Sequence, residues 1–175
     1  FGDIEEVTGS NPVGPTMIFW YILLMKDVTL CFLRKTENDQ ELVCLAMKKR
    51  GFGEGKWNGV GGKVQDEEIE AAAIREASEE ISVLINDLTK VAELEFITMG
   101  LRCHVYITET WEGEPEESEE MKPKWFALHE IPYNDMWDDD RIWLPQLLEG
   151  KTIKGTFHFD ENDLLIEHNI EEAQF

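Results

Sequence analysis

The 175-residue chain has 37 acidic and 16 basic residues, which gives a formal net charge of −21, and its length suits one domain with a sizeable core. This charge argues against binding to a nucleic-acid polymer, whose phosphates require a basic surface, but it does not exclude a nucleotide. Cys31, Cys44 and Cys103 are widely spaced among apolar residues, which predicts reduced core thiols of a cytosolic protein rather than disulfides or a zinc site.

The first part of the chain is expected to be an N-terminal extension, residues 1–27, followed by one domain over residues 28–175. Residues 1–15 are rich in Gly, Pro, Ser and Asn, which predicts disorder. Residues 17–25 are apolar but too few to span a bilayer, which needs about 20 residues. They also lack the flanks of a signal peptide, so no membrane association is expected.

Two apolar, β-branched stretches at residues 28–34 and 41–47 are joined by the polar turn TENDQ, which predicts a hairpin. The segment KKRGFGEGKWNGVGGK follows and has six glycines between Gly51 and Gly62. Backbone amides in such a segment can approach a phosphate closely, although glycine-rich loops alone are weak evidence. Phe52 and Trp57 in this loop could stack on a base or simply anchor the loop.

A helix is predicted over residues 67–81, because this stretch has strong helix formers and no internal Gly or Pro. Asp66 is the expected N-cap. At about 100° per residue, Glu76, Glu79 and Glu80 share one arc of the helix surface, where they repel one another. Acidic residues on one side of a helix more often form a solvated surface than a binding site. A hard cation such as Mg²⁺ or Mn²⁺ would, however, offset the repulsion among the three carboxylates.

The rest of the chain alternates strand and turn signals. Strands are expected at residues 91–97, 101–108, 124–128, 154–159 and 164–170. The last two flank the turn DEND and are predicted to form a closing hairpin. Asp138 is the expected N-cap of a shorter helix that ends near Gly150, with Pro145 as a kink or a late start. A mixed set of strands with one long and one short helix suits an α/β/α sandwich.

The glycine pair and the acidic helix together carry a resemblance to a known family. The pattern G-x5-E-x7-R-E-U-x-E-E-x-G-U is the Nudix box, and the matching positions here are Gly61, Glu67, Arg75, Glu76, Glu79, Glu80 and Val83. Glu68 is an alternative to Glu67 at the first acidic position. Two positions depart from the pattern, since Ala77 replaces a bulky aliphatic residue and Ser82 replaces a glycine. A left-handed turn at Ser82 would cost about 1 kcal/mol more than at glycine.

The resemblance implies a Nudix-type α/β/α sandwich with a mixed sheet and a divalent cation, Mg²⁺ or Mn²⁺. The implied cation ligands are the Gly61 carbonyl, Glu76, Glu79, Glu80 and Glu120. The implied catalytic residues are Glu76, Glu79 and Glu80, with Arg75 orienting a glutamate; the general base is expected among Glu79, Glu80 and Glu120.

Segments outside the box, including the glycine-rich loop, ESEEMKPKWF and IPYNDMWDDDRIWLPQLL, are similar to the eukaryotic MutT-like branch of this family. That similarity implies hydrolysis of oxidised purine nucleoside triphosphates, of the 8-oxo-dGTP and 2-hydroxy-dATP type, to the monophosphate and pyrophosphate. The base would be read by Asn58, Asp139 and Asp140, with Trp137 stacking on it. The further pocket positions implied are Thr29, Lys48 and Phe52.

If Asp139 and Asp140 are both buried, one carboxyl could stay protonated and donate to a purine edge while the other accepts. The plain alternative is that the acids only cap a helix and that Trp137 belongs to the core. A different nucleotide substrate, or an inactive nucleotide-binding module, is the alternative function. The expected partner is a free nucleotide bound by a monomer in the cytoplasm, with nuclear or mitochondrial pools as further locations.

Overall fold

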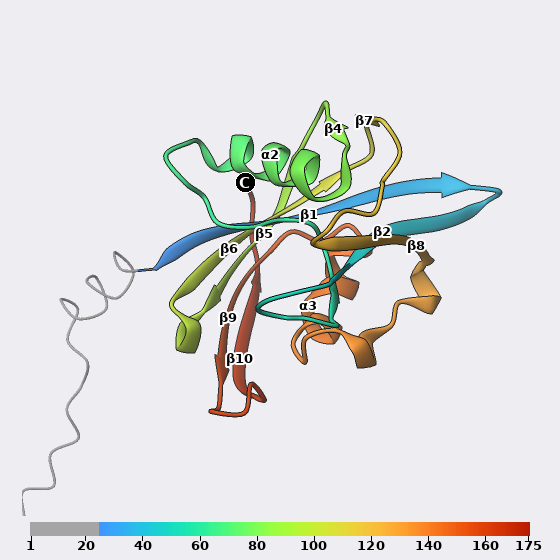
Figure 1. The fold of residues 1–175 in the computed structure, drawn as a ribbon. Coiled ribbons are helices and arrows are strands. Elements are labelled where there is room, and N and C mark those ends of the chain that lie inside the picture. The colour runs from blue at the N-terminus through green and yellow to red at the C-terminus, as the bar shows by residue number, and fades with distance from the viewer. Residues whose placement is uncertain (1–24) are drawn as a thin grey trace, which may run out of the picture.

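The computed structural model describes residues 25–175, so the predictions for residues 1–15, and for residues 17–25 except Met25, lie outside the described part. One mixed eight-stranded sheet forms the centre, in the order β10-β9-β5-β6-β1-β2-β3, with β8 also pairing with β2 (Figure 1). Pairing is parallel for β1 with β6 and for β5 with β9, and antiparallel elsewhere in this sheet. Its strands are β1 Lys26–Glu37, β2 Gln40–Lys48, β3 Trp57–Asn58, β5 Thr89–Phe96, β6 Leu101–Thr108, β8 Met121–Ala127, β9 Ile153–Phe159 and β10 Leu165–Glu172.

The remaining elements flank this sheet. A second, two-stranded sheet pairs β4 Leu84–Ile85 with β7 Trp111–Glu112. The helices are α2 Ile69–Ile81, α3 Asp140–Leu148 and the short 3₁₀ helices η1 Ile97–Met99, η2 Leu128–Glu130 and η3 Tyr133–Asp135. No helix within residues 25–175 is long and apolar enough to cross a membrane.

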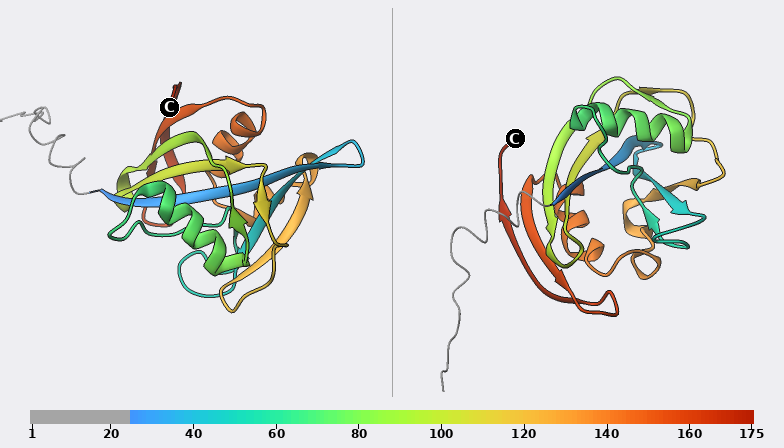
Figure 2. Two further views of the ribbon diagram at one scale, coloured as in Figure 1. Left: turned by 90° about the horizontal axis from the view of Figure 1, so that it is seen from above. Right: turned by 60° about the vertical axis from the view of Figure 1, so that its left-hand side comes forward.

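The two helices cover opposite faces of the sheet, which confirms the predicted α/β/α sandwich (Figures 1 and 2). Alternation along β1 explains the two cores, because successive side chains of a strand point to opposite faces. Phe32 packs in the core under α3, and its neighbours Cys31 and Leu33 pack in the core under α2. All three cysteines are buried and unpaired, as expected of core thiols.

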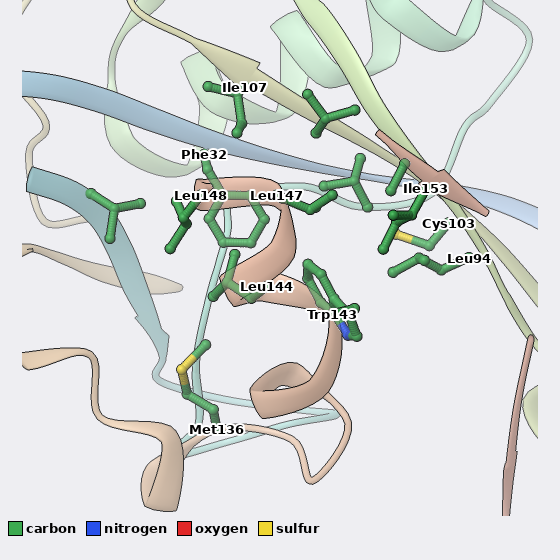
Figure 3. Packing of buried hydrophobic residues seen from close by; sticks show 14 of the residues in the cluster. Phe32, Leu94, Cys103, Ile107, Met136, Trp143, Leu144, Leu147, Leu148 and Ile153 are labelled. Carbon is green, nitrogen blue, oxygen red and sulfur yellow. The ribbon is translucent and has the colours of Figure 1, made fainter. Parts of the chain in front are cut away.

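The core beneath α3 fixes the position of that helix (Figure 3). Trp143 is fully buried, and its ring meets the Phe32 ring edge to face at 6.1 Å between centroids. Leu144 and Leu147 pack in the same cluster. Truncation of a buried Trp to Ala costs about 3–5 kcal/mol of folding free energy, so this packing holds helix α3 and the adjacent Asp139 and Asp140 in place.

Both predicted hairpins are confirmed. Asn38 and Asp39 form the two-residue turn between β1 and β2 with φ of 52° and 61°, as a type I′ turn requires. β9 and β10 pair antiparallel around the turn that contains Asp163, which also has a positive φ of 59°.

Two predicted helix caps are wrong. Helix α2 begins at Ile69 after Glu68, which has an extended backbone, and not after Asp66. Glu67 precedes the helix and pairs with Arg75 at 2.6 Å. Helix α3 follows Asp139, which makes no side-chain cap, and Asp138 instead lies 3.7 Å from the Arg141 guanidinium. The left-handed turn expected after α2 is present, since Ser82 has a φ of 61°.

Candidate functional site

A cavity of about 750 Å³ lies between the sheet, the glycine-rich loop and the start of α3. Its walls include every residue for which a role in substrate binding was predicted, together with two of the predicted cation ligands. These residues are Thr29, Lys48, Phe52, Asn58, Trp137, Asp139 and Asp140, with Gly61 and Glu120. The sheet thus brings together segments that lie more than a hundred residues apart in the sequence.

In the wall of the cavity, Asp139 and Asp140 are almost completely buried. The Trp143 indole donates to Asp139 Oδ2 at 2.7 Å, and the Trp137 amide donates to Asp140 Oδ2 at 2.9 Å. Burial raises the pKa of Asp139, and burial together with the charge of Asp139 raises the pKa of Asp140 well above its usual range. The raised pKa values favour the protonated form of the pair, in which one carboxyl can donate a hydrogen bond.

The Trp137 ring forms a wall beside these acids. The Phe52 ring stacks on it at 5.0 Å, and Lys56 Nζ lies 4.9 Å from its centre and donates to the Met136 carbonyl at 3.1 Å. Gly53 is needed in the loop, since its φ is +81° and an added Cβ would lie 3.3 Å from Trp137. Trp57, in contrast, packs edge to face on a core phenylalanine of β8 and anchors the loop.

The glycine pair lies between the cavity and α2. A Cβ on Gly61 would lie 1.9 Å from the Thr29 carbonyl, and one on Gly62 would lie 2.6 Å from the Glu76 carboxyl. Only glycine allows the backbone to pass this close to both β1 and the acidic helix. The Gly61 amide donates to Glu80 Oε2 at 3.0 Å, so the close approach places a backbone segment directly on a buried carboxylate.

Glu80 is buried and has Lys48 Nζ 3.5 Å from its Oε1. Burial raises the pKa of Glu80 to about 7, although the Gly61 amide and Lys48 both oppose the rise. The protein groups around this carboxylate thus compensate its charge incompletely.

Arg75 holds the other acids of the helix. Its guanidinium contacts Glu67 at 2.6 Å, Glu76 at 2.8 Å and Glu79 at 3.1 Å, and it donates to the Lys63 carbonyl at 3.2 Å. The hydrogen bond from Arg75 holds the pKa of Glu67 below its usual range. Glu67 rather than Glu68 therefore contacts Arg75, and Arg75 contacts three acids without lining the cavity.

Glu120 lies at the rim of the cavity, where Arg50 Nη2 contacts its carboxylate at 2.6 Å and Lys48 Nζ lies 3.8 Å away. In residues 25–175, no three Asp, Glu, His or Cys side chains stand together as a ready metal site. Arginine and lysine lie among the predicted ligands instead.

The donor set nevertheless fits a hard cation, because every predicted ligand offers oxygen. Glu80 in addition is a buried carboxylate whose charge lacks full compensation. A cation bound here would supply that compensation.

The cavity also has residues that local sequence patterns did not reveal. Arg50 lies at the rim, and Cys103 lies in the wall, where burial and the nearby Asp139 and Asp140 raise the pKa of its thiol. The Thr29 hydroxyl is buried without a hydrogen-bond partner in the described part of the chain. An apolar wall comes from strands far away in the sequence and consists of Val28, Leu30, Phe96, Met99, Leu101 and Phe159. No local motif marks these residues, since only the sheet order brings them to one place.

Comparison with known proteins identifies the family of the chain and relatives of the same fold. The NUDIX domain model matches residues 25–147. The chain is 44% identical over 137 residues to the oxidized purine nucleoside triphosphate hydrolase of Danio rerio, and this match covers 75% of this chain and 88% of that protein. It is also 44% identical over 136 residues to the protein of the same name from Mus musculus, covering 75% and 87%. A mutator MutT protein from Bacillus halodurans has a similar fold, with a TM-score of 0.68 at 24% identity over 84% of this chain and 98% of that one.

Proposed function

The chain belongs to the Nudix family, and from this membership we propose that it hydrolyses oxidised purine nucleoside triphosphates to the monophosphate and pyrophosphate. One observation carries the choice of substrate: two adjacent aspartates, Asp139 and Asp140, are buried together in the wall of the cavity. The names of the two relatives at 44% identity support the same substrate class.

The buried pair suits a purine whose edge has been changed by oxidation. With one carboxyl protonated and the other ionised, Asp139 and Asp140 present a donor beside an acceptor. The proton can reside on either carboxyl, so the pair matches more than one arrangement of purine donors and acceptors. Asn58 adds an amide to the cavity wall, and Trp137 offers a flat face for stacking.

We propose Mg²⁺ as the cation, with Mn²⁺ able to replace it, held by Glu76, Glu79, Glu80, Glu120 and the Gly61 carbonyl. When bound, the cation neutralises phosphate charge and lowers the pKa of a water that attacks phosphorus. Lys48 lies between Glu80 and Glu120, where its ammonium can hold the phosphates in line. Glu79, Glu80 or Glu120 accepts the proton of the attacking water, and Arg75 keeps Glu76 and Glu79 in place.

The test is pyrophosphate release by the purified protein with Mg²⁺ from 8-oxo-dGTP, 2-hydroxy-dATP, dGTP and ADP-ribose. We expect the two oxidised triphosphates to be preferred, and the Glu79→Gln and Glu80→Gln variants to be inactive but folded. Preference for ADP-ribose would keep the family chemistry but refute the base assignment. An absence of turnover with every substrate would favour a nucleotide-binding module, and full activity of both variants would contradict the cation site.

We further propose that the protein acts as a monomer on free nucleotides in the cytoplasm. Its charge of −21 disfavours a polymer of phosphates as the partner. Its three buried, unpaired cysteines suit a reducing compartment.

A further inference from the structure

Three consecutive cations, Lys48, Lys49 and Arg50, lie where β2 ends and the glycine-rich loop begins. Lys48 and Arg50 line the cavity, as expected for side chains two residues apart on one side of an extended chain. Lys49 reaches away from it, with its Nζ 2.8 Å from Glu117 Oε1 and donating to the Ser118 carbonyl at 2.8 Å. Lys48 and Arg50 therefore line the cavity, whereas Lys49, which lies between them in the sequence, pairs with Glu117 outside it.

Arg50 can exchange its ion-pair partner, Glu120, for another anion. Its guanidinium binds Glu120 at 2.6 Å and lies 4.0 Å from Glu119, and the Arg50 side chain is 60% exposed. Ion pairs this exposed are held weakly. Glu120 is also a proposed ligand of the cation, so its transfer to the cation would leave the Arg50 guanidinium free for another anion.

The contacts place these groups in a definite order. Lys48 touches both Glu80 and Glu120, and Arg50 touches the other carboxylate oxygen of Glu120. Phosphates bound beside these two proposed cation ligands would therefore meet Lys48 and then Arg50. The guanidinium fork matches phosphate oxygens in geometry as well as charge.

Resting on the proposed function, we propose that Arg50 binds the outer phosphates, those that leave as pyrophosphate, by exchanging the Glu120 carboxylate for phosphate oxygens. Arg50 is then a determinant of phosphate-chain length, which favours triphosphates over shorter nucleotides. The base pocket and this contact are separate, so the two can be measured separately.

The test compares Arg50→Gln with Lys49→Gln, a matched control that removes one charge from the adjacent residue but faces away from the cavity. Binding of the monophosphate 8-oxo-dGMP and of a non-hydrolysable analogue of 8-oxo-dGTP is measured by calorimetry. We expect Arg50→Gln to weaken binding of the triphosphate analogue about tenfold, the equivalent of one charge-assisted hydrogen bond, and Lys49→Gln to leave it unchanged. Binding of 8-oxo-dGMP should be unchanged in both variants, and Arg50→Lys should restore part of the loss.

Equal losses in the two variants would show only a general effect of charge and would overturn the inference. The inference would also be overturned if Arg50→Gln left triphosphate binding unchanged, or if it weakened monophosphate binding as much as triphosphate binding. If the unaltered protein does not prefer 8-oxo-dGMP over dGMP, the proposed function itself fails, which is a different result from failure of the Arg50 contact. Thermal unfolding of each variant checks that its fold is intact.

Discussion

Glu80→Gln should make the metal-free protein more stable at alkaline pH while abolishing its turnover. Glu80 is buried, and its pKa is raised from 4.5 to about 7, chiefly by desolvation of the carboxylate. A carboxyl whose pKa is higher in the folded state stabilises the fold at low pH, fully below pH 4.5, and that stability is lost as the pH rises through about 7. Each tenfold change in proton affinity corresponds to about 1.4 kcal/mol, so the loss approaches about 3 kcal/mol above pH 8.

The Glu80→Gln substitution removes the ionisation but keeps an oxygen that can accept from the Gly61 amide. The measurement is urea unfolding of both proteins in EDTA at several values between pH 4.5 and pH 8.5. The free energy of unfolding of the unaltered protein should fall relative to that of the variant by up to about 3 kcal/mol across this range, since other titrating groups are common to both proteins. A difference between the two proteins that does not change with pH would refute the reasoning, and so would a variant less stable at pH 8.5. With Mg²⁺ present the order should reverse, because only the carboxylate binds the cation strongly.

Three further changes test other parts of the site. Ser82→Gly should raise the free energy of unfolding by about 1 kcal/mol, because glycine adopts the left-handed conformation at this position without strain; an unchanged melting temperature would contradict this. Arg75→Gln should lower kcat at least about tenfold with little change in KM, since the residue positions acids but does not line the cavity; a change confined to KM would instead indicate substrate contact. Asp140→Asn should lower kcat/KM for oxidised purines about tenfold or more, because a fixed amide cannot exchange donor and acceptor roles with Asp139. Steady-state rates with 8-oxo-dGTP and 2-hydroxy-dATP measure this effect, and a variant as active as the unaltered protein would show that the assignment is wrong.

Local patterns were enough to predict the acidic helix and the two hairpins, because each depends on residues close together in the sequence. The layered arrangement was predicted from the mixture of strands and helices together with the family resemblance. Glu76, Glu79 and Glu80 could be placed on one arc from helical geometry alone, and the contact between Arg75 and Glu79 follows from the same spacing. The predicted caps are displaced by one or two residues, and the acids beside the observed helix starts pair with arginines, Glu67 with Arg75 and Asp138 with Arg141.

The walls of the cavity depend on sheet order, which the sequence does not reveal locally. β1 pairs in parallel with β6, so Val28 lies beside Cys103 although 75 residues separate them. The pairing of β2 with β8 likewise brings Lys48 opposite Met121 and its neighbour Glu120. Only the family resemblance pointed to Glu120, and nothing local distinguished Arg50 from its neighbouring lysine.

The charges of the site explain how so acidic a protein can bind a polyanion. The basic side chains Lys48, Arg50 and Arg75 are all paired with acids, and those acids include the proposed ligands of the divalent cation. Phosphate and cation therefore complement each other, since a carboxylate that turns to the cation leaves a basic side chain free for phosphate. Binding of either partner should accordingly strengthen binding of the other by the same factor, as linkage requires.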